Sequence, residues 1–162
     1  MKKVILLAAI VLAVVFVSND SQAQTNRFGF MVDLASGDFD ETGIGALGEF
    51  KVIEKGTISP QLIFYFPGND ITLFELNGNF NYYFYDQDIV EFYGLAGLNF
   101  TRVSWDDDNG NDGSETEMGL NLGAGINFDL GKKVAPFAEL RFTIGEYDQF
   151  VLGLGLKIAL NN

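Results

Sequence analysis

The chain has 162 residues, with 10 Lys and Arg against 22 Asp and Glu, and it contains neither cysteine nor histidine. This length indicates a single domain. The missing residue types remove disulfides, thiol nucleophiles, and the commonest general base and metal ligand. The formal net charge of -12 opposes binding to nucleic acid, which requires a basic surface. We therefore expect no nucleic-acid partner, no cofactor and no enzymatic activity.

The first 23 residues have the pattern of a cleaved signal peptide. Lys2 and Lys3 precede a run of 14 apolar residues, 4–17. Such a run suits a signal-peptide core and is shorter than the roughly 20 residues that a spanning helix needs. Small residues at Ser21 and Ala23 suit cleavage before Gln24. We predict a signal peptide at 1–23 and one mature domain at 24–162, with a buried N-terminal helix as the alternative.

Eight apolar segments follow, separated by turn-rich clusters. Glycine lies inside most of them, Pro60 and Pro136 interrupt two, and aromatic and β-branched residues are abundant, which favours strand over helix. Each segment is long enough to cross a membrane as a tilted strand. We predict strands at residues 26–34, 42–52, 58–66, 72–84, 90–100, 118–130, 134–144 and 150–160.

The eight segments alternate in polarity with a period of two residues. None of their 48 even-numbered positions is charged, and only Asn26, Thr42 and Thr72 are hydrophilic. One face of each predicted strand is therefore apolar. The odd-numbered positions carry glycines, asparagines and ten charged residues: Arg27, Asp33, Glu49, Lys51, Glu75, Glu91, Asp129, Glu139, Arg141 and Lys157.

Two folds satisfy this alternation. A soluble β-sandwich or lipocalin-like barrel would bury the even face, but its 13 phenylalanines would overfill the interior of a narrow barrel. The odd face mixes small residues with Tyr65, Tyr83, Tyr93 and Phe137, which suits a narrow lumen. A closed barrel also pairs every backbone group, as lipid requires. We predict an all-β, eight-stranded antiparallel up-and-down transmembrane barrel, with the soluble sandwich as the alternative.

The connectors between the predicted strands indicate an orientation. They contain 7, 5, 5, 5, 17, 3 and 5 residues. Outer-membrane barrels have short periplasmic turns and longer external loops, so the first, third, fifth and seventh connectors are expected outside. These four connectors carry only one cation, Arg102, and twelve acids: Asp38, Asp40, Glu41, Asp70, Asp106, Asp107, Asp108, Asp112, Glu115, Glu117, Glu146 and Asp148.

Together these features resemble the small eight-stranded outer-membrane β-barrels, the OmpA- and OmpX-like barrels often classed as porin-family proteins of the Gram-negative envelope. The resemblance covers the mature chain and is strongest in MGLNLGAGINFDLGKKVAPFAELRFTIG, residues 118–145, and FVLGLGLKIAL, residues 150–160. It concerns architecture and not an activity. It implies a monomer in the outer membrane, in contact with outer-membrane lipid and lipopolysaccharide.

The charged residues of the odd face are the first candidate site. Charges inside a narrow barrel must pair to offset their desolvation, so a structural network is favoured over a gate or polar conduit. A hairpin near residues 145–148 would place Gly153 and Gly155 across from Glu139 and Arg141. The predicted network comprises Arg27, Glu49, Lys51, Glu75, Glu91, Glu139, Arg141 and Lys157.

The second candidate is the acidic run Asp106, Asp107, Asp108 and Asp112, placed in an external loop. Clustered carboxylates suggest calcium, but Gly110 falls where an EF-hand requires a ligand. A solvated loop is favoured and no metal site is predicted, with loose association of divalent cations beside lipid phosphates as the alternative. Four aromatic residues are candidate exposed contacts or interfacial anchors: Phe39, Trp105, Phe137 and Tyr147.

Two main functions remain open for such a barrel. The favoured one is a structural or surface-interaction role, in which the external loops contact an extracellular or envelope protein partner. The alternative is a narrow porin-like channel for small solutes, which requires a continuous lumen.

Overall fold

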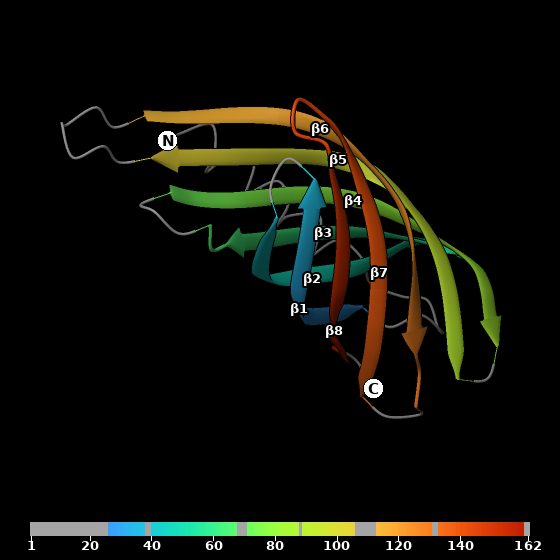
Figure 1. The fold of residues 1–162 in the computed structure, drawn as a ribbon. Coiled ribbons are helices and arrows are strands. Elements are labelled where there is room, and N and C mark those ends of the chain that lie inside the picture. The colour runs from blue at the N-terminus through green and yellow to red at the C-terminus, as the bar shows by residue number, and fades with distance from the viewer. Residues whose placement is uncertain are drawn as a thin grey trace.

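The computed structural model describes residues 26–37, 40–67, 71–87, 89–105, 113–130 and 133–160. They form one closed antiparallel barrel, in which each strand pairs with the next in chain order and the last pairs with the first. Figure 1 shows the strongly tilted strands, with β1, β7 and β8 crossing those on the far side. The predicted fold class is confirmed. The strands are β1 Arg27–Gly37, β2 Glu41–Ile53, β3 Gly56–Tyr65, β4 Ile71–Gln87, β5 Val90–Trp105, β6 Gly113–Phe128, β7 Val134–Gly145 and β8 Gln149–Ala159.

The barrel has two ends, and at one of them the first strand, β1, begins and the last strand, β8, finishes. We call the end where β1, β3, β5 and β7 finish the loop end, and the end that holds residues 26 and 160 the turn end. At the turn end the Leu160 N–H donates to the Asn26 carbonyl at 2.8 Å, which continues the pairing of β1 with β8. The sheet therefore has no free edge along its closure, as a strand in hydrocarbon requires.

The strands β5 and β6 are longer than the sequence predicts. Residues 101–105 of β5 pair with residues 113–117 of β6, and the ladder ends with Trp105 opposite Gly113. The prediction of a 17-residue connector at 101–117 is therefore wrong. The error has a physical cause, because outward positions such as Arg102 and Thr116 are polar and break the apolar pattern that marked the other strands. The pairing of β6 with β7 stops at Gly119, so this part of β5 and β6 projects beyond β7.

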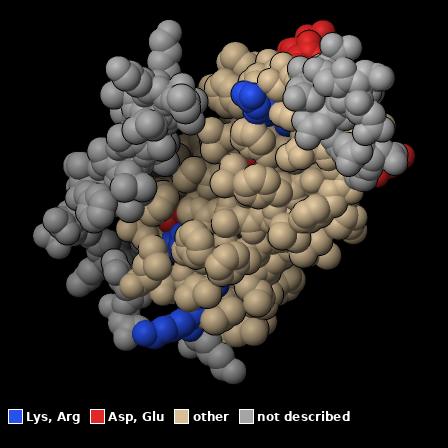
Figure 2. Space-filling model, turned by 90° about the vertical axis from the view of Figure 1, so that its left-hand side faces the viewer, with Lys and Arg blue, Asp and Glu red and all other residues tan. Residues whose placement is uncertain are grey.

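The predicted alternation of faces is confirmed. Away from the strand ends and bulges, odd-numbered side chains point into the barrel and even-numbered apolar side chains cover its outside; Phe30 is 58% exposed whereas the neighbouring Met31 is 3% exposed. In Figure 2 most of the described surface belongs to uncharged residues, with Lys, Arg, Asp and Glu mainly at its upper and lower margins. No helix among the described residues is long and apolar enough to span a membrane.

Aromatic rings gather on the outer face near both ends of the barrel. Near the turn end Phe84 and Phe92 stack with their centroids 6.4 Å apart. Near the loop end Phe142 and Phe150 pack edge to face at 6.0 Å. A β-bulge between Tyr83 and Tyr85 shifts the register of β4, so Tyr85 adds another ring beside Phe92. Two girdles of aromatic side chains, one near each end, are typical of membrane barrels.

Candidate functional site in the barrel lumen

A first group of ions lies in the lumen toward the turn end. Arg27 of β1 holds Glu91 of β5 through two parallel hydrogen bonds of 2.6 and 2.7 Å. Lys157 of β8 donates to Glu49 of β2 at 2.6 Å, and Arg27 lies 3.7 Å from that same Glu49. We call these four residues the paired cluster. Two acids meet two bases, so the charge balances, and charge-assisted hydrogen bonds offset the desolvation of the ions.

Neutral side chains complete the partners of the paired cluster. The Tyr83 hydroxyl donates to Glu49 at 2.6 Å, and the Asn127 amide donates to Glu91 at 2.8 Å. Lys157 also donates to the Asn127 oxygen at 3.0 Å. Its ammonium lies 4.7 Å from the Tyr93 ring centroid, a cation-π contact. Glu49, Glu91 and Lys157 therefore each have an ionic and at least one neutral partner, and Arg27 lies between two carboxylates.

A second group lies further toward the loop end, around the guanidinium of Arg141 on β7. Its Nη2 is 3.0 Å from Asp33 of β1 and 3.5 Å from Glu75 of β4, and its Nη1 is 3.4 Å from Glu139. We call these four residues the Arg141 cluster. All four are fully buried or nearly so. Here three acids surround one base, so the charge does not balance.

Buried amides and hydroxyls extend polar contacts across the lumen wall. Asn77 accepts hydrogen bonds from Asn99 and from Asn121, both at 2.8 Å. The Thr143 hydroxyl donates to Asn121 at 2.9 Å. These four residues come from β4, β5, β6 and β7, so one chain of hydrogen bonds ties four strands together.

An apolar layer fills the lumen at the loop end. It contains the last inward-facing residues of several strands, none more than 8% exposed, and Tyr147 packs against it. Val151 lies opposite Arg141, and the Tyr65 hydroxyl contacts Glu75, so these apolar side chains pack against the Arg141 cluster and the described lumen is occupied by side chains rather than left open. The layer comprises Ala35, Tyr65, Leu73, Val103 and Val151.

The structure brings most of the predicted network residues together. All of them except Lys51 take part in ion pairs. Lys51 is half-buried; its backbone N–H donates to the Asn26 side chain at 3.3 Å, and no ion pair between described residues includes it. The alternation places Asp33 on the inward face, but the predicted network does not include it. No local signal marked it, because its contact with Arg141 depends on the register of β1, β8 and β7.

The register of β7 against β8 also differs from the predicted pairing, and this difference changes the surroundings of Arg141 and Phe137. Gly153 lies opposite Glu139, as expected, but Val151 rather than a glycine lies opposite Arg141. Gly155 lies opposite Phe137 instead, and Phe137 fills the space that this glycine leaves. Phe137 is only 3% exposed, so the prediction of an exposed contact there is wrong.

The remaining predicted contacts lie at the loop end. Trp105 is 41% exposed. Tyr147 is half-buried, and its hydroxyl donates to Glu115 at 3.5 Å. Desolvation and the carboxylate of Glu115 raise the pKa of Tyr147, which keeps the phenol neutral. Phe39 and the acidic residues Asp106, Asp107, Asp108 and Asp112 lie outside the described residues.

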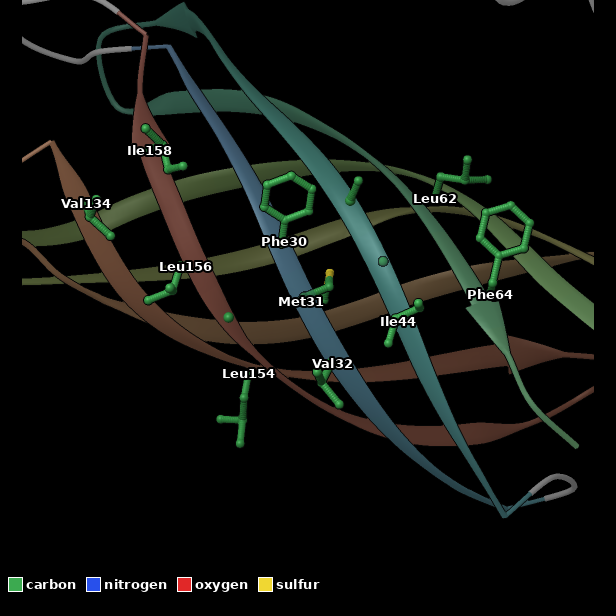
Figure 3. Close-up of a pocket in the computed structure, with 13 residues that line it drawn as sticks. Phe30, Met31, Val32, Ile44, Leu62, Phe64, Val134, Leu154, Leu156 and Ile158 are labelled. Carbon is green, nitrogen blue, oxygen red and sulfur yellow. The ribbon is translucent and has the colours of Figure 1, made fainter.

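No metal centre is found in the part of the chain that the structure describes. No group of three or more carboxylates there is arranged to hold a metal ion. A hollow of about 660 Å³ lies over β1, β2, β3, β7 and β8, and only apolar side chains and glycine line it. Figure 3 shows Phe30, Leu154 and Leu156 around it on the outer face of the barrel. This lining suits hydrocarbon and provides no group for chemistry.

The fold and the polar lumen define a small eight-stranded barrel of the outer-membrane type. No protein-family model and no curated protein sequence matches the chain. Among solved structures, Neisserial surface protein A is 19% identical with a TM-score of 0.67, over 83% of this chain and 96% of that chain. The N-terminal β-barrel domain of OprF from Pseudomonas aeruginosa is 17% identical with a TM-score of 0.63, over 83% and 97%.

A third similar structure is Ail, the attachment invasion locus protein of Yersinia pestis. It is 14% identical with a TM-score of 0.61, over 83% of this chain and 95% of that chain. Another structure of Ail contains the heparin analogue sucrose octasulfate. At these identities the similarity establishes the fold and leaves the function of this chain to be argued from its own residues.

Proposed function

We propose that this chain is an integral protein of the bacterial outer membrane, exported by a signal peptide at 1–23. The observation that carries the proposal is the reversal of the usual distribution of polarity. Large apolar side chains such as Leu122 are half-exposed all around the outside, whereas Glu75 and Arg141 are buried inside. In water this arrangement would expose a large apolar surface and bury ions. In a membrane it places apolar residues against lipid.

The proposed role is structural or surface-interacting, and neither catalytic nor conducting. The buried ions are held by one another and by neutral donors. Buried apolar side chains at the loop end pack beside them. A porin-like channel would need a continuous path, and neither of these features favours one.

The projecting part of β5 and β6 is the proposed contact surface at the loop end. It carries the exposed Trp105, and the exposed Arg102 donates to Ser114 at 2.9 Å. Nearby described residues are mostly acidic, among them Glu115 and Glu146. Sucrose octasulfate, the ligand present with Ail, is a polyanion, whereas an acidic surface favours a cationic partner. We propose an extracellular or envelope protein with a basic surface, or divalent cations that bridge to lipopolysaccharide.

Fractionation of cells that express the full chain tests the proposal. We expect the mature protein to begin at Gln24, to remain with outer membranes and to migrate differently on gels before and after heating. Recovery of the protein as a soluble periplasmic monomer would contradict membrane insertion.

A further inference from the structure

The two ion clusters of the lumen differ in charge balance. In the paired cluster two carboxylates face Arg27 and Lys157. In the Arg141 cluster three carboxyl groups face one guanidinium. If all three were ionised, two negative charges would remain uncompensated in a buried site. Such charges are costly away from water, and a carboxyl group avoids the cost by keeping its proton.

No other base within the cluster supplies the missing positive charge. Strands β3, β4, β5 and β8 contribute neutral groups around it: Gln61, Tyr65, Asn77, Tyr93 and Gln149. Strands β2 and β6 contribute glycine at the same levels, with Gly43 opposite Asp33 and Gly123 opposite Arg141. The cation nearest along the network is Lys157, and it is bonded to Glu49.

The three carboxyl groups differ in how many donors stabilise their ionised form. Besides Arg141, Glu139 accepts from Gln61 at 3.1 Å and from Tyr93 at 2.8 Å. Besides Arg141, Glu75 accepts from Gln149, from Tyr65 and from Asn77. Hydrogen bonds of this kind favour the carboxylate.

Asp33 has far fewer donors. Its Oδ2 accepts from Arg141 at 3.0 Å. Its Oδ1 is buried and has no hydrogen-bond partner among the described residues. Gly153 lies beside this oxygen, close enough that a Cβ there would meet it at 2.9 Å. The least stabilised anion of the three is therefore Asp33.

We infer that the Arg141 cluster is a buried proton-binding site, and that Asp33 keeps its proton in the folded barrel at pH values where the unfolded chain has lost it. The proton is exchanged with water without any other chemical change. The inference rests on the described lumen and not on the location of the protein or its partners. A protonated Asp33 is neutral, and uptake of its proton on folding makes the stability of the barrel depend on pH.

The direction of the pH effect follows from proton counting. In the unfolded chain Asp33 is ionised above about pH 4. If the folded barrel keeps the proton, folding takes up one proton, and stability falls as pH rises above that value. The unfolding equilibrium constant then rises by up to about tenfold per pH unit until the folded Asp33 also ionises. The pH dependence that comes from the rest of the chain must be subtracted.

The variant Asp33→Asn performs this subtraction, because it replaces a neutral carboxyl group by an amide of the same shape. Urea unfolding of the full barrel in lipid vesicles is measured from pH 5 to pH 9. We expect wild type to lose stability relative to Asp33→Asn as pH rises, with the variant the more stable of the two at pH 9. The matched control is Glu91→Gln in the paired cluster, which we expect to be destabilised at every pH because Arg27 loses its ionised partner.

Infrared spectroscopy gives a second readout, which is measured first on the wild-type protein and so does not depend on whether a variant folds. A protonated carboxyl group has a C=O stretching band that a carboxylate lacks. We expect this band in wild type at pH 6, which lies above the ordinary titration range of exposed carboxyl groups, and its loss in Asp33→Asn. Absence of the band from wild type would overturn the proposal. It would be overturned equally if Asp33→Asn and Glu91→Gln were destabilised alike across the pH range.

Discussion

Tyr93 occupies the middle of the lumen because Gly125 of the adjacent strand leaves room for its ring. The Tyr93 hydroxyl donates to Glu139, and its ring lies under Lys157, so this one side chain links the two ion clusters. A Cβ at Gly125 would collide with the ring and hydroxyl of Tyr93. The glycine is therefore needed for close approach and not for an unusual backbone angle.

Gly125→Ala tests this packing. We expect it to lower the free energy of unfolding by about 1 to 3 kcal/mol, because the added methyl group must displace a ring that is already hydrogen-bonded. The matched control is Gly78→Ala on the outer face, where a Cβ would meet nothing within 4 Å. Urea unfolding in lipid vesicles measures both. Equal effects of the two substitutions would show that Tyr93 is not held in this position.

Glu49 is the carboxylate on which the paired cluster depends. It accepts from Lys157 and Tyr83, both at 2.6 Å. Glu49→Gln leaves a buried ammonium without its counterion, so we expect a loss of about 3 kcal/mol in the free energy of unfolding. Glu54→Gln in the exposed turn between β2 and β3 is the control and should change stability by less than about 0.5 kcal/mol. A loss at Glu49→Gln no greater than at the control would mean that this pair does not stabilise the fold.

The strands show what sequence can and cannot predict. The alternation of polarity identified all eight strands and their inward faces, because each inward or outward position has its own physical requirement. The register was not encoded locally, so the prediction missed Val151 opposite Arg141 and the contact of Asp33 with Arg141. The extension of β5 and β6 was missed because outward residues such as Arg102 and Thr116 are polar.

The outer face of β6 provides a test of lipid contact. Leu122 is 52% exposed and lies mid-strand, between Ala96 and Phe142 of the neighbouring strands. Leu122→Arg should lower the free energy of unfolding in lipid vesicles by about 2 to 4 kcal/mol. Thr42→Arg, at an outward position close to the loop end of β2, should cost at most about 1 kcal/mol. A tolerated arginine at Leu122 would contradict the assignment of this face to the membrane interior.

The connection between β5 and β6 can be shortened without removing a ladder pair. Because Trp105 pairs with Gly113, residues 106–112 can be replaced by Asn-Gly, which closes a two-residue hairpin. Deletions that include Gly113 would remove the last pair. We expect the shortened protein to keep its heat-modifiable migration and to unfold at the same urea concentration as wild type. A barrel that no longer assembles would show that this connection contributes to folding.

The whole barrel is stabilised from both sides of its wall. Ion pairs and amides join strands distant in sequence, such as β1 to β5 through Arg27 and Glu91, or β1 to β7 through Asp33 and Arg141. Outside, apolar side chains are placed to meet lipid. The result is a wall that closes on itself around a filled interior.

Ion conductance of the purified protein in a planar bilayer tests the filled lumen most directly. We predict a conductance near zero for wild type, because paired ions and an apolar layer occupy the interior. Joint replacement of Glu139, Arg141 and Lys157 by alanine should open or destabilise the barrel. Steady conductance of the unmodified protein, altered by these inward substitutions but unchanged when residues 106–112 are replaced, would contradict the filled barrel and establish a channel.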